Sequence, residues 1–342
     1  MTKRRRPDWE RLPDDRLLAR RISGLGLSLR GTPAEAAIRR LYRELAAHGL
    51  RLRPRCWVAL EWFSPDGVPG IAVPFYLLHP RLVSLQRRHG GEAEGGNVRD
   101  LMRILRHEAG HAIDNAFRLR RRAGWRAAFG PASRRYAGSY RPRPGSRRYV
   151  QHLGGWYSQS HPAEDFAETF AVWLTPGSDW RHRYAAWRPA LAKLQYVDRL
   201  MRELRGRRPP VRAARVIEPA RASRLTLGRY YRRLAHRQGG PSAPRVDAAL
   251  RRVFAPPAPG RRRPSGARVL REEMPRVRRR VARELNVSEY LVQEVMRRMI
   301  VRSRALGLRL RGRRRACGPK LVRMVAAEVA HSMHQCGPRQ SL

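Results

Sequence analysis

The stretch LMRILRHEAGHAIDNAF, residues 101–117, contains His107, Glu108 and His111 in the spacing HExxH. Its apolar residues recur every three or four positions, which predicts a continuous helix. Residues four apart lie one above the other on a helix, so the two imidazoles can reach one zinc ion. Glu108 then lies beside the ion, where it can take a proton from a water bound to it. The stretch therefore predicts a zinc site with His107 and His111 as ligands and Glu108 as the general base.

A catalytic zinc ion needs a third protein ligand and leaves one position for water. The metzincin pattern would place Gly and a further ligand three and six residues after His111, but Asp114 and Phe117 stand there. The third ligand is therefore expected elsewhere in the chain. Asp114 follows His111 by one helical turn, so it is either a hydrogen-bond partner of the ligands or an exposed helix acid.

A second stretch, HPAEDFAETFAVW at residues 161–173, predicts another helix, which begins near Pro162 and ends before Thr-Pro-Gly at 175–177. Glu164 and Glu168 are four residues apart and share one face of this helix. One of them can bind zinc while the other accepts a hydrogen bond from a ligand imidazole and fixes its tautomer. Glu164 is the first candidate for the third ligand, and the residue types leave these rivals: Asp165, Glu168, His152 and His161.

HEAGH followed by EDFAE resembles the gluzincin metallopeptidases, in which the third ligand is a glutamate on a separate helix. The pairing of HExGH with HPxEDxAE resembles a bacterial family of zinc-binding metallopeptidases and, more distantly, the catalytic domain of anthrax lethal factor. In both, a tyrosine lies seven residues before the ligand glutamate, and Tyr157 in GGWYSQSHPAE occupies that position here. The resemblance covers roughly residues 10–205.

The resemblance implies a role for each matching residue. His107, His111 and Glu164 would bind one Zn²⁺, Glu108 would be the base and Glu168 would hydrogen-bond a ligand. Tyr157 would donate to the oxyanion that forms when a peptide carbonyl is attacked. Other tyrosines in the same region remain alternatives for that role: Tyr136, Tyr140 and Tyr149.

The same resemblance implies a zincin-like domain with a small sheet and active-site helices. Residues 270–304 and 320–334 also look helical, so the expected fold is α+β: this domain followed by a mainly helical basic extension. Residues 32–48 predict a helix with Thr32 as its N-cap and Gly49 after its end. Two apolar runs, 57–63 and 71–78, predict a β-like region, in which Pro69 and Pro74 limit the second run to an edge strand or an irregular segment. By analogy with zincins, 71–76 is the expected edge on which an extended peptide pairs.

The composition changes near residue 205, which predicts two domains, 1–205 and 206–342. Residues 206–342 hold 35 basic and 8 acidic residues. A Pro/Gly-rich segment, 237–266, is expected to be a linker or a mobile loop.

The formal net charge is +47, and 71 of the 74 basic residues are arginine. Codon bias in a GC-rich bacterial genome explains such a skew, and so does an anionic partner such as nucleic acid. Residues 281–295, VARELNVSEYLVQEV, fit a helix-turn-helix pattern with Asn286 at the turn. The alternative function is therefore a DNA-associated regulatory protein in which the zinc site is structural or idle.

Three cysteines, Cys56, Cys317 and Cys336, are too few and too scattered for a secreted disulfide framework. No apolar run follows the basic start, and no stretch approaches the ~18 apolar residues of a membrane span. The expected location is the cytoplasm. The function expected from the sequence is a zinc-dependent metallopeptidase that cleaves peptide or protein substrates through a zinc-activated water.

Overall fold

The computed structural model describes residues 8–90, 93–136, 143, 146–153, 156–212, 215–239, 243–258, 263–285, 289–312 and 314–335. The chain is mostly helical, with two small two-stranded sheets. It forms two compact units, made of the described residues of Met1–Ser84 and Ala93–Tyr230, and of Leu85–Glu92 and Tyr231–Leu342. The expected division into a peptidase domain ending at 205 and a basic extension stays a prediction.

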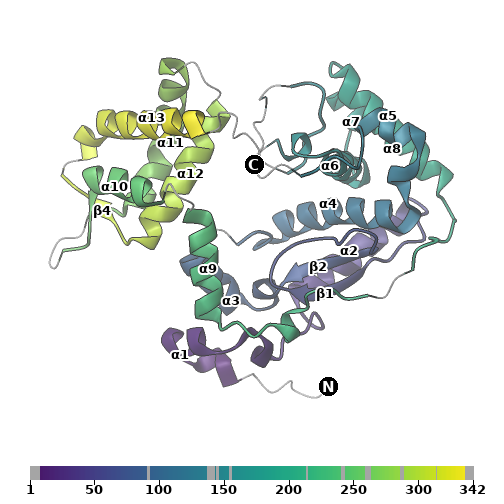
Figure 1. Cartoon of the computed structure of the whole chain (residues 1–342), viewed down its shortest axis with the longest axis horizontal. Coiled ribbons are helices and arrows are strands. Elements are labelled where there is room, and N and C mark those ends of the chain that lie inside the picture. The colour runs from purple at the N-terminus through teal and green to yellow at the C-terminus, as the bar shows by residue number, and fades with distance from the viewer. Residues whose placement is uncertain are drawn as a thin grey trace. The chain divides into compact units, whose positions relative to one another are not determined.

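The first unit is built mainly from helices (Figure 1). Its elements are η1 (Asp8–Arg11), α1 (Asp14–Ala19), η2 (Ile22–Leu25), α2 (Pro33–Ala47), β1 (Arg55–Ala59), β2 (Gly70–Pro74), η3 (Phe75–Leu78), α4 (Val98–Phe117), η4 (Leu119–Arg121), α5 (Ala123–Phe129), η5 (Tyr157–Gln159), α6 (Pro162–Leu174), α7 (Trp180–Arg183), α8 (Arg188–Glu203) and η6 (Ala220–Ala222). Two further helices, α3 (Pro80–His89) and α9 (Leu227–Gly239), continue from one unit into the other.

Helix α2 confirms the helix expected over 32–48 and its capping residues. The Thr32 side chain accepts a hydrogen bond from the backbone N–H of Glu35, and Gly31 N–H donates to the Glu35 carboxylate at 2.6 Å. The bond from Glu35 satisfies an N–H group that the first helical turn leaves without a partner. The bond from Gly31 ties the residue before the N-cap to the same turn. Gly49 follows the helix with φ of 74°, a backbone conformation that favours glycine.

The small sheet pairs β1 with β2 in parallel, with Trp57 opposite Ala72. On the side of β2 away from β1, the backbone N–H of Ala72 donates to the carbonyl of Phe63 at 2.9 Å. All five residues of β2 are buried, and the chain turns into the 3-10 helix η3 directly after Pro74. The expectation that 71–76 is a free edge for a peptide is therefore wrong, because the segment around Phe63 already occupies that edge.

Helix α4 lies between the β1–β2 pair with α2 on one side and α6 on the other (Figure 1). Asn97 caps its N-terminus by accepting from the backbone N–H of Asp100. Helix α6 begins and ends where the sequence predicted, and every one of its residues is buried. A helix that is apolar on most of its faces is stable only when neighbours cover it on all sides. Here α4, α5 and α8 provide that cover.

The second unit packs four helices around one apolar core. Its elements after α9 are α10 (Ala243–Val253), β3 (Phe254–Ala255), α11 (Gly266–Glu284), α12 (Glu289–Ala305), β4 (Arg309–Leu310), η7 (Arg314–Ala316) and α13 (Cys317–Gln335). The strands β3 and β4 pair antiparallel. The expectation of a linker over 237–266 does not hold for 243–255, which form α10 and β3. Their apolar residues Val246, Leu250 and Val253 recur at helical spacing and pack into the core.

The residues of the helix-turn-helix pattern fall on α11 and α12. Ala282, Val292 and Val295 are buried in the core of this unit, so their spacing is accounted for by packing. The turn residues 286–288 lie outside the described residues, and DNA binding stays a prediction. None of the helices in the described part of the chain has the length and apolar character needed to cross a bilayer.

Candidate metal centre

Three side chains from two helices converge between α4 and α6. His107 Nε2 lies 3.0 Å from Glu164 Oε2, and His111 Nε2 lies 3.1 Å from the same oxygen. The two histidine Nε2 atoms are 3.2 Å apart. These three atoms form the one group of three or more potential metal ligands among the described residues.

The spacing of the three atoms fits a zinc ion. Two ligand atoms bound to zinc at about 2.0–2.1 Å with tetrahedral angles lie about 3.3 Å from each other. The three observed separations, 3.0 to 3.2 Å, are close to that value. Two imidazoles and one carboxylate also leave a fourth tetrahedral position for water, which is typical of catalytic zinc sites.

Glu168 bonds the Nδ1 atom of His107, on the side of the ring away from the other two ligands. Its Oε1 lies 3.0 Å from His107 Nδ1, and the carboxylate also accepts hydrogen bonds from the backbone N–H groups of His152 and Leu153 at 2.8 to 3.0 Å. Glu168 is fully buried, so these donors compensate for the loss of water around its charge. The contact to Nδ1 turns Nε2 of His107 toward His111 and Glu164, which is the orientation a metal ligand needs.

Hydrogen bonds outweigh burial in setting the charges of the cluster. Burial lowers the pKa of His107, but hydrogen bonds to Glu164 and Glu168 raise it, with the result at about 10. Burial raises the pKa of Glu164, but hydrogen bonds with His107 and His111 lower it by more than burial raises it. The resulting pKa is well below the usual range of a glutamate. Both shifts favour a negative charge on Glu164 beside the His107 ring, and that charge would also stabilise a cation held between these side chains.

Glu108 is anchored by Ser64, a residue outside the predicted site. The hydroxyl of Ser64 donates to Glu108 Oε2 at 2.8 Å, and it lies 3.2 Å from the backbone carbonyl of Glu108. Ser64 follows Phe63, whose pairing with Ala72 fixes this segment along β2. One oxygen of the Glu108 carboxylate is thereby held, while the Glu108 side chain as a whole is buried.

Two tyrosines lie beside the cluster. The ring of Tyr157, on η5, is centred 5.7 Å from the His107 ring. The hydroxyl of Tyr136 donates to Glu164 Oε1 at 2.9 Å, and its ring stacks on His161 at 3.8 Å. Tyr136 therefore bonds the Glu164 oxygen that does not face the histidines. Of the other expected alternatives, Tyr140 lies outside the described residues.

The rival ligands have other partners. The Asp165 carboxylate pairs with Lys193, and burial raises the pKa of Asp165 to about 7 although Lys193 lowers it. His161 caps α6, where its Nδ1 accepts a hydrogen bond from the backbone N–H of Ala163. His152 Nε2 bonds the carbonyl of Arg103.

Asp114 is fully buried one turn beyond His111. Both of its carboxylate oxygens accept hydrogen bonds from Arg120, one from the backbone N–H and one from Nε. This pairing ties the end of α4 to η4. An orienting effect of Asp114 on His111 stays a prediction.

Residues 85–180 match the family described as "Putative zinc-binding metallo-peptidase". The match includes α4, α6 and all three residues of the cluster, and it confirms the resemblance inferred from HEAGH and EDFAE. It covers the centre of the 10–205 range over which the resemblance was expected. No curated protein and no solved structure matches the chain.

Proposed function

We propose that the chain is a zinc-dependent metallopeptidase with a zincin-like first unit, and that it hydrolyses bonds in peptide or protein substrates. The observation that carries the proposal is the convergence of His107, His111 and Glu164 on one point between two helices. The matched family supports the same conclusion. We assign the three residues as the ligands of a single zinc ion.

The chemistry needs an electrophilic centre next to a base. A zinc ion held by two imidazoles and one carboxylate supplies Lewis acidity, which makes water more acidic and polarises a carbonyl. The chain must hold the ligands, place the base and stabilise the oxygen that becomes negative.

We assign Glu108 as the base. The Ser64 hydroxyl occupies Oε2 of its carboxylate, so Oε1 is the oxygen that accepts the proton from the attacking water. Glu108 then delivers this proton to the amine that leaves when the peptide bond breaks. Because Ser64 restricts the Glu108 carboxylate to one orientation, less conformational entropy is lost when Glu108 takes up the proton.

We assign Tyr157 as the donor to the oxyanion. Its side chain is 37% exposed and lies against the His107 ring, so its hydroxyl can reach a substrate in the open position. Tyr136 already bonds Glu164, and we assign it the role of holding that ligand. The two tyrosines would thus act on different species, the substrate and the metal ligand.

Replacement of Glu108 by glutamine tests the proposal. The amide keeps the shape and the hydrogen bond with Ser64 but cannot accept the proton. We expect Glu108→Gln to retain one zinc per chain and to cleave a peptide library at least ~100-fold more slowly than the wild type. A Glu108→Gln protein with wild-type cleavage rates would contradict the assignment.

A further inference from the structure

We propose that a basic cavity in the first unit binds a small anion that carries two or more phosphate groups. The cavity has a volume of about 500 Å³, within the range of small-molecule sites. It is separate from the metal centre, since it shares no lining residue with it. The lining residues are Arg51, Leu52, Arg53, Arg55, Pro69, Arg208, Pro209, Val211 and Arg212.

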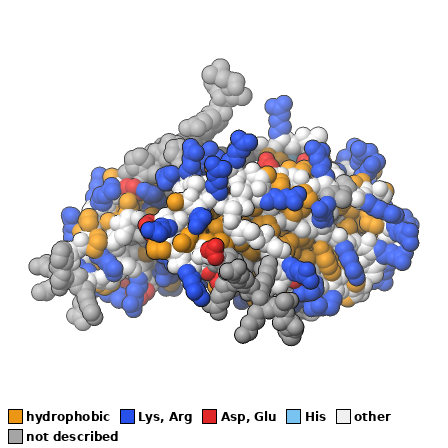
Figure 2. Space-filling model, turned by 90° about the horizontal axis from the view of Figure 1, so that it is seen from below, with side chains coloured by type: hydrophobic (Ala, Val, Ile, Leu, Met, Phe, Trp, Pro, Cys, Tyr) orange, Lys and Arg blue, Asp and Glu red, His pale blue; other side chains and the backbone are white. Residues whose placement is uncertain are grey.

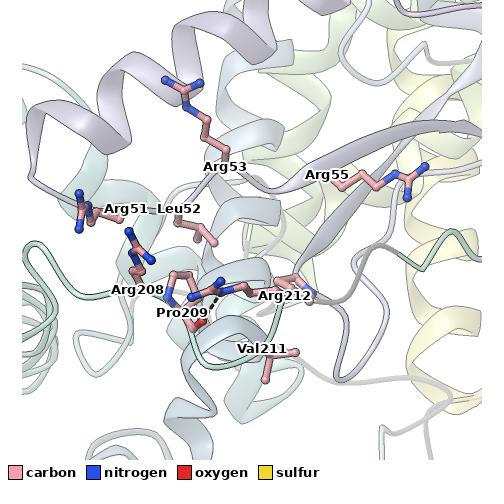
Figure 3. Close-up of a pocket in the computed structure, with 9 residues that line it drawn as sticks. Arg51, Leu52, Arg53, Arg55, Arg208, Pro209, Val211 and Arg212 are labelled. Carbon is pink, nitrogen blue, oxygen red and sulfur yellow. Dashed lines mark hydrogen bonds between the residues drawn. The ribbon is translucent and has the colours of Figure 1, made fainter.

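Two segments of chain form the walls of the cavity. In the segment leading into β1, the exposed residues Arg51, Arg53 and Arg55 alternate with the buried Leu52 and Pro54. The segment after α8 supplies Arg208 and Arg212. Figure 3 shows Arg51, Arg208 and Arg212 around the space between the segments, whereas Arg53 and Arg55 point away from it.

Backbone hydrogen bonds hold the two segments in place. The N–H of Gly206 donates to the carbonyl of Gly49 at 3.0 Å, and the N–H of Val211 donates to the carbonyl of Ala116 at 3.1 Å. Pro209 and Pro210 restrict the chain between these anchors, because each proline fixes its own φ. The cavity is thus formed before any ligand arrives.

The cavity concentrates positive charge without compensation from its own walls. Three arginines, Arg51, Arg208 and Arg212, surround the space, and none of the nine lining residues is acidic. Elsewhere in this unit, arginines pair with carboxylates, as Arg106 does with Glu44 and Arg120 with Asp114. In the described part of the chain, by contrast, no ion pair involves Arg208 or Arg212.

The hydrogen bonds that Arg51 and Arg212 make in the cavity wall use only some of their N–H groups. Arg212 Nε donates to the carbonyl of Pro209 at 3.4 Å, and Arg51 Nη1 donates to that of Gly206 at 3.4 Å. A guanidinium carries five N–H donors, so Arg51 and Arg212 each keep further donors for a ligand. Their planar fork matches the oxygens of a phosphate better than an isolated ammonium does.

A compact ligand fits this site better than a nucleic acid. Figure 2 shows Lys and Arg side chains spread over the visible face, with no single track for an extended phosphate backbone on that face. The cavity instead gathers several guanidinium groups around one small volume, flanked by Leu52, Pro209 and Val211. That combination suits a short chain of phosphates, either free or attached to an organic group.

Calorimetric titration of the full chain tests the proposal. Sodium tripolyphosphate, ADP and citrate are titrated at about 150 mM salt, where isolated surface charges are largely screened. We expect tripolyphosphate and ADP each to saturate one site, and citrate to bind at least tenfold more weakly. Equal affinities for tripolyphosphate and ADP would assign recognition to the phosphate chain, and tighter binding of ADP would add the nucleoside.

Two double variants of equal charge separate the cavity from general attraction. The first variant, Arg208→Gln with Arg212→Gln, removes two guanidinium groups from the cavity. The second, Arg221→Gln with Arg224→Gln, removes two exposed guanidinium groups of the same unit that do not line the cavity. We expect at least a tenfold loss of affinity in the first pair and less than a twofold loss in the second. Both pairs keep the metal centre, so phosphate that binds zinc contributes equally to each. Equal losses in the two pairs, binding that does not saturate, or binding only of DNA or RNA would overturn the proposal.

Discussion

Gly110 of α4 and Ala167 of α6 lie so close together that a Cβ atom on Gly110 would come within 2.7 Å of the Ala167 Cα. Gly110 stands between Glu108 and His111, and Ala167 stands between Glu164 and Glu168. The lack of a side chain on Gly110 thus permits the helix approach that brings the carboxylates to the imidazoles.

Gly110→Ala is therefore expected to separate the two helices at the metal centre. We predict a zinc affinity at least tenfold lower than that of the wild type, together with a loss of roughly 1–3 kcal/mol in the free energy of unfolding. Competition with a chromophoric chelator and urea denaturation measure the two effects. Gly24→Ala is a suitable control, because a Cβ there meets nothing within 4 Å. Wild-type zinc affinity in Gly110→Ala would show that the close approach is not required.

Ser64 provides a second test, which concerns the orientation of the base. Ser64→Ala removes the hydroxyl that donates to Glu108 Oε2. A hydrogen bond to a charged group contributes about 1.5–3 kcal/mol, so we predict a kcat roughly 10- to 100-fold lower with KM and zinc content unchanged. Ser64→Thr retains a hydroxyl and should recover most of the rate. An unchanged kcat in Ser64→Ala would remove Ser64 from the account of catalysis.

The two tyrosines are expected to differ in what their loss affects. Tyr157→Phe should lower kcat by about 10²–10³-fold, as the loss of one oxyanion donor does, and leave zinc affinity unchanged. Tyr136→Phe should weaken zinc binding, since Glu164 Oε1 loses its donor. Kinetics and zinc titration of both variants distinguish these roles. The opposite pattern would exchange the assignments of Tyr136 and Tyr157.

Cys56 gives a prediction on pH. Burial raises the pKa of its thiol to about 12, although the hydrogen bond with Tyr42 lowers it. The thiol of an unfolded cysteine has a pKa of about 8.5. Between this pH and about 12, the Cys56 thiol is therefore ionised in the unfolded chain and still protonated in the folded one. The contribution of Cys56 to stability is therefore complete below the lower value and is lost as pH rises through this range.

Urea denaturation at several pH values tests whether the contribution of Cys56 to stability falls as pH rises. The difference in unfolding free energy between wild type and Cys56→Ala should decrease between pH 9 and 11. In the folded protein at pH 9, Cys56 should also react slowly with iodoacetamide, as mapped by mass spectrometry. A difference that grows with pH, or rapid alkylation of folded protein, would contradict the raised pKa.

The elements that depend on local signals could be read from the sequence. Thr32 and Gly49 indicated the ends of α2, and Pro162 with the Thr-Pro-Gly at 175–177 indicated those of α6. The candidate ligands could be named as well, because the four-residue spacing of His107 and His111 is a property of any helix.

The features that depend on tertiary pairing could not be read in this way. The role of Ser64 requires that the segment beside β2 reach α4, and no local signal encodes that contact. Tyr136 was one of several tyrosines until its hydroxyl was found on Glu164. The backbone N–H groups of His152 and Leu153, which hold Glu168, have no signature in the sequence at all, since every residue except proline carries one.

The most direct test of the central claim is the zinc content of the purified full chain, measured by mass spectrometry of the metal in the wild type, His111→Ala and Glu164→Gln. We predict one zinc ion per wild-type chain and a loss of most of it in both variants, because His111→Ala removes one ligand atom and Glu164→Gln replaces the anionic ligand by a neutral amide. A wild-type chain without zinc, or undiminished zinc in both variants, would contradict the claim that these residues from α4 and α6 hold a single metal ion.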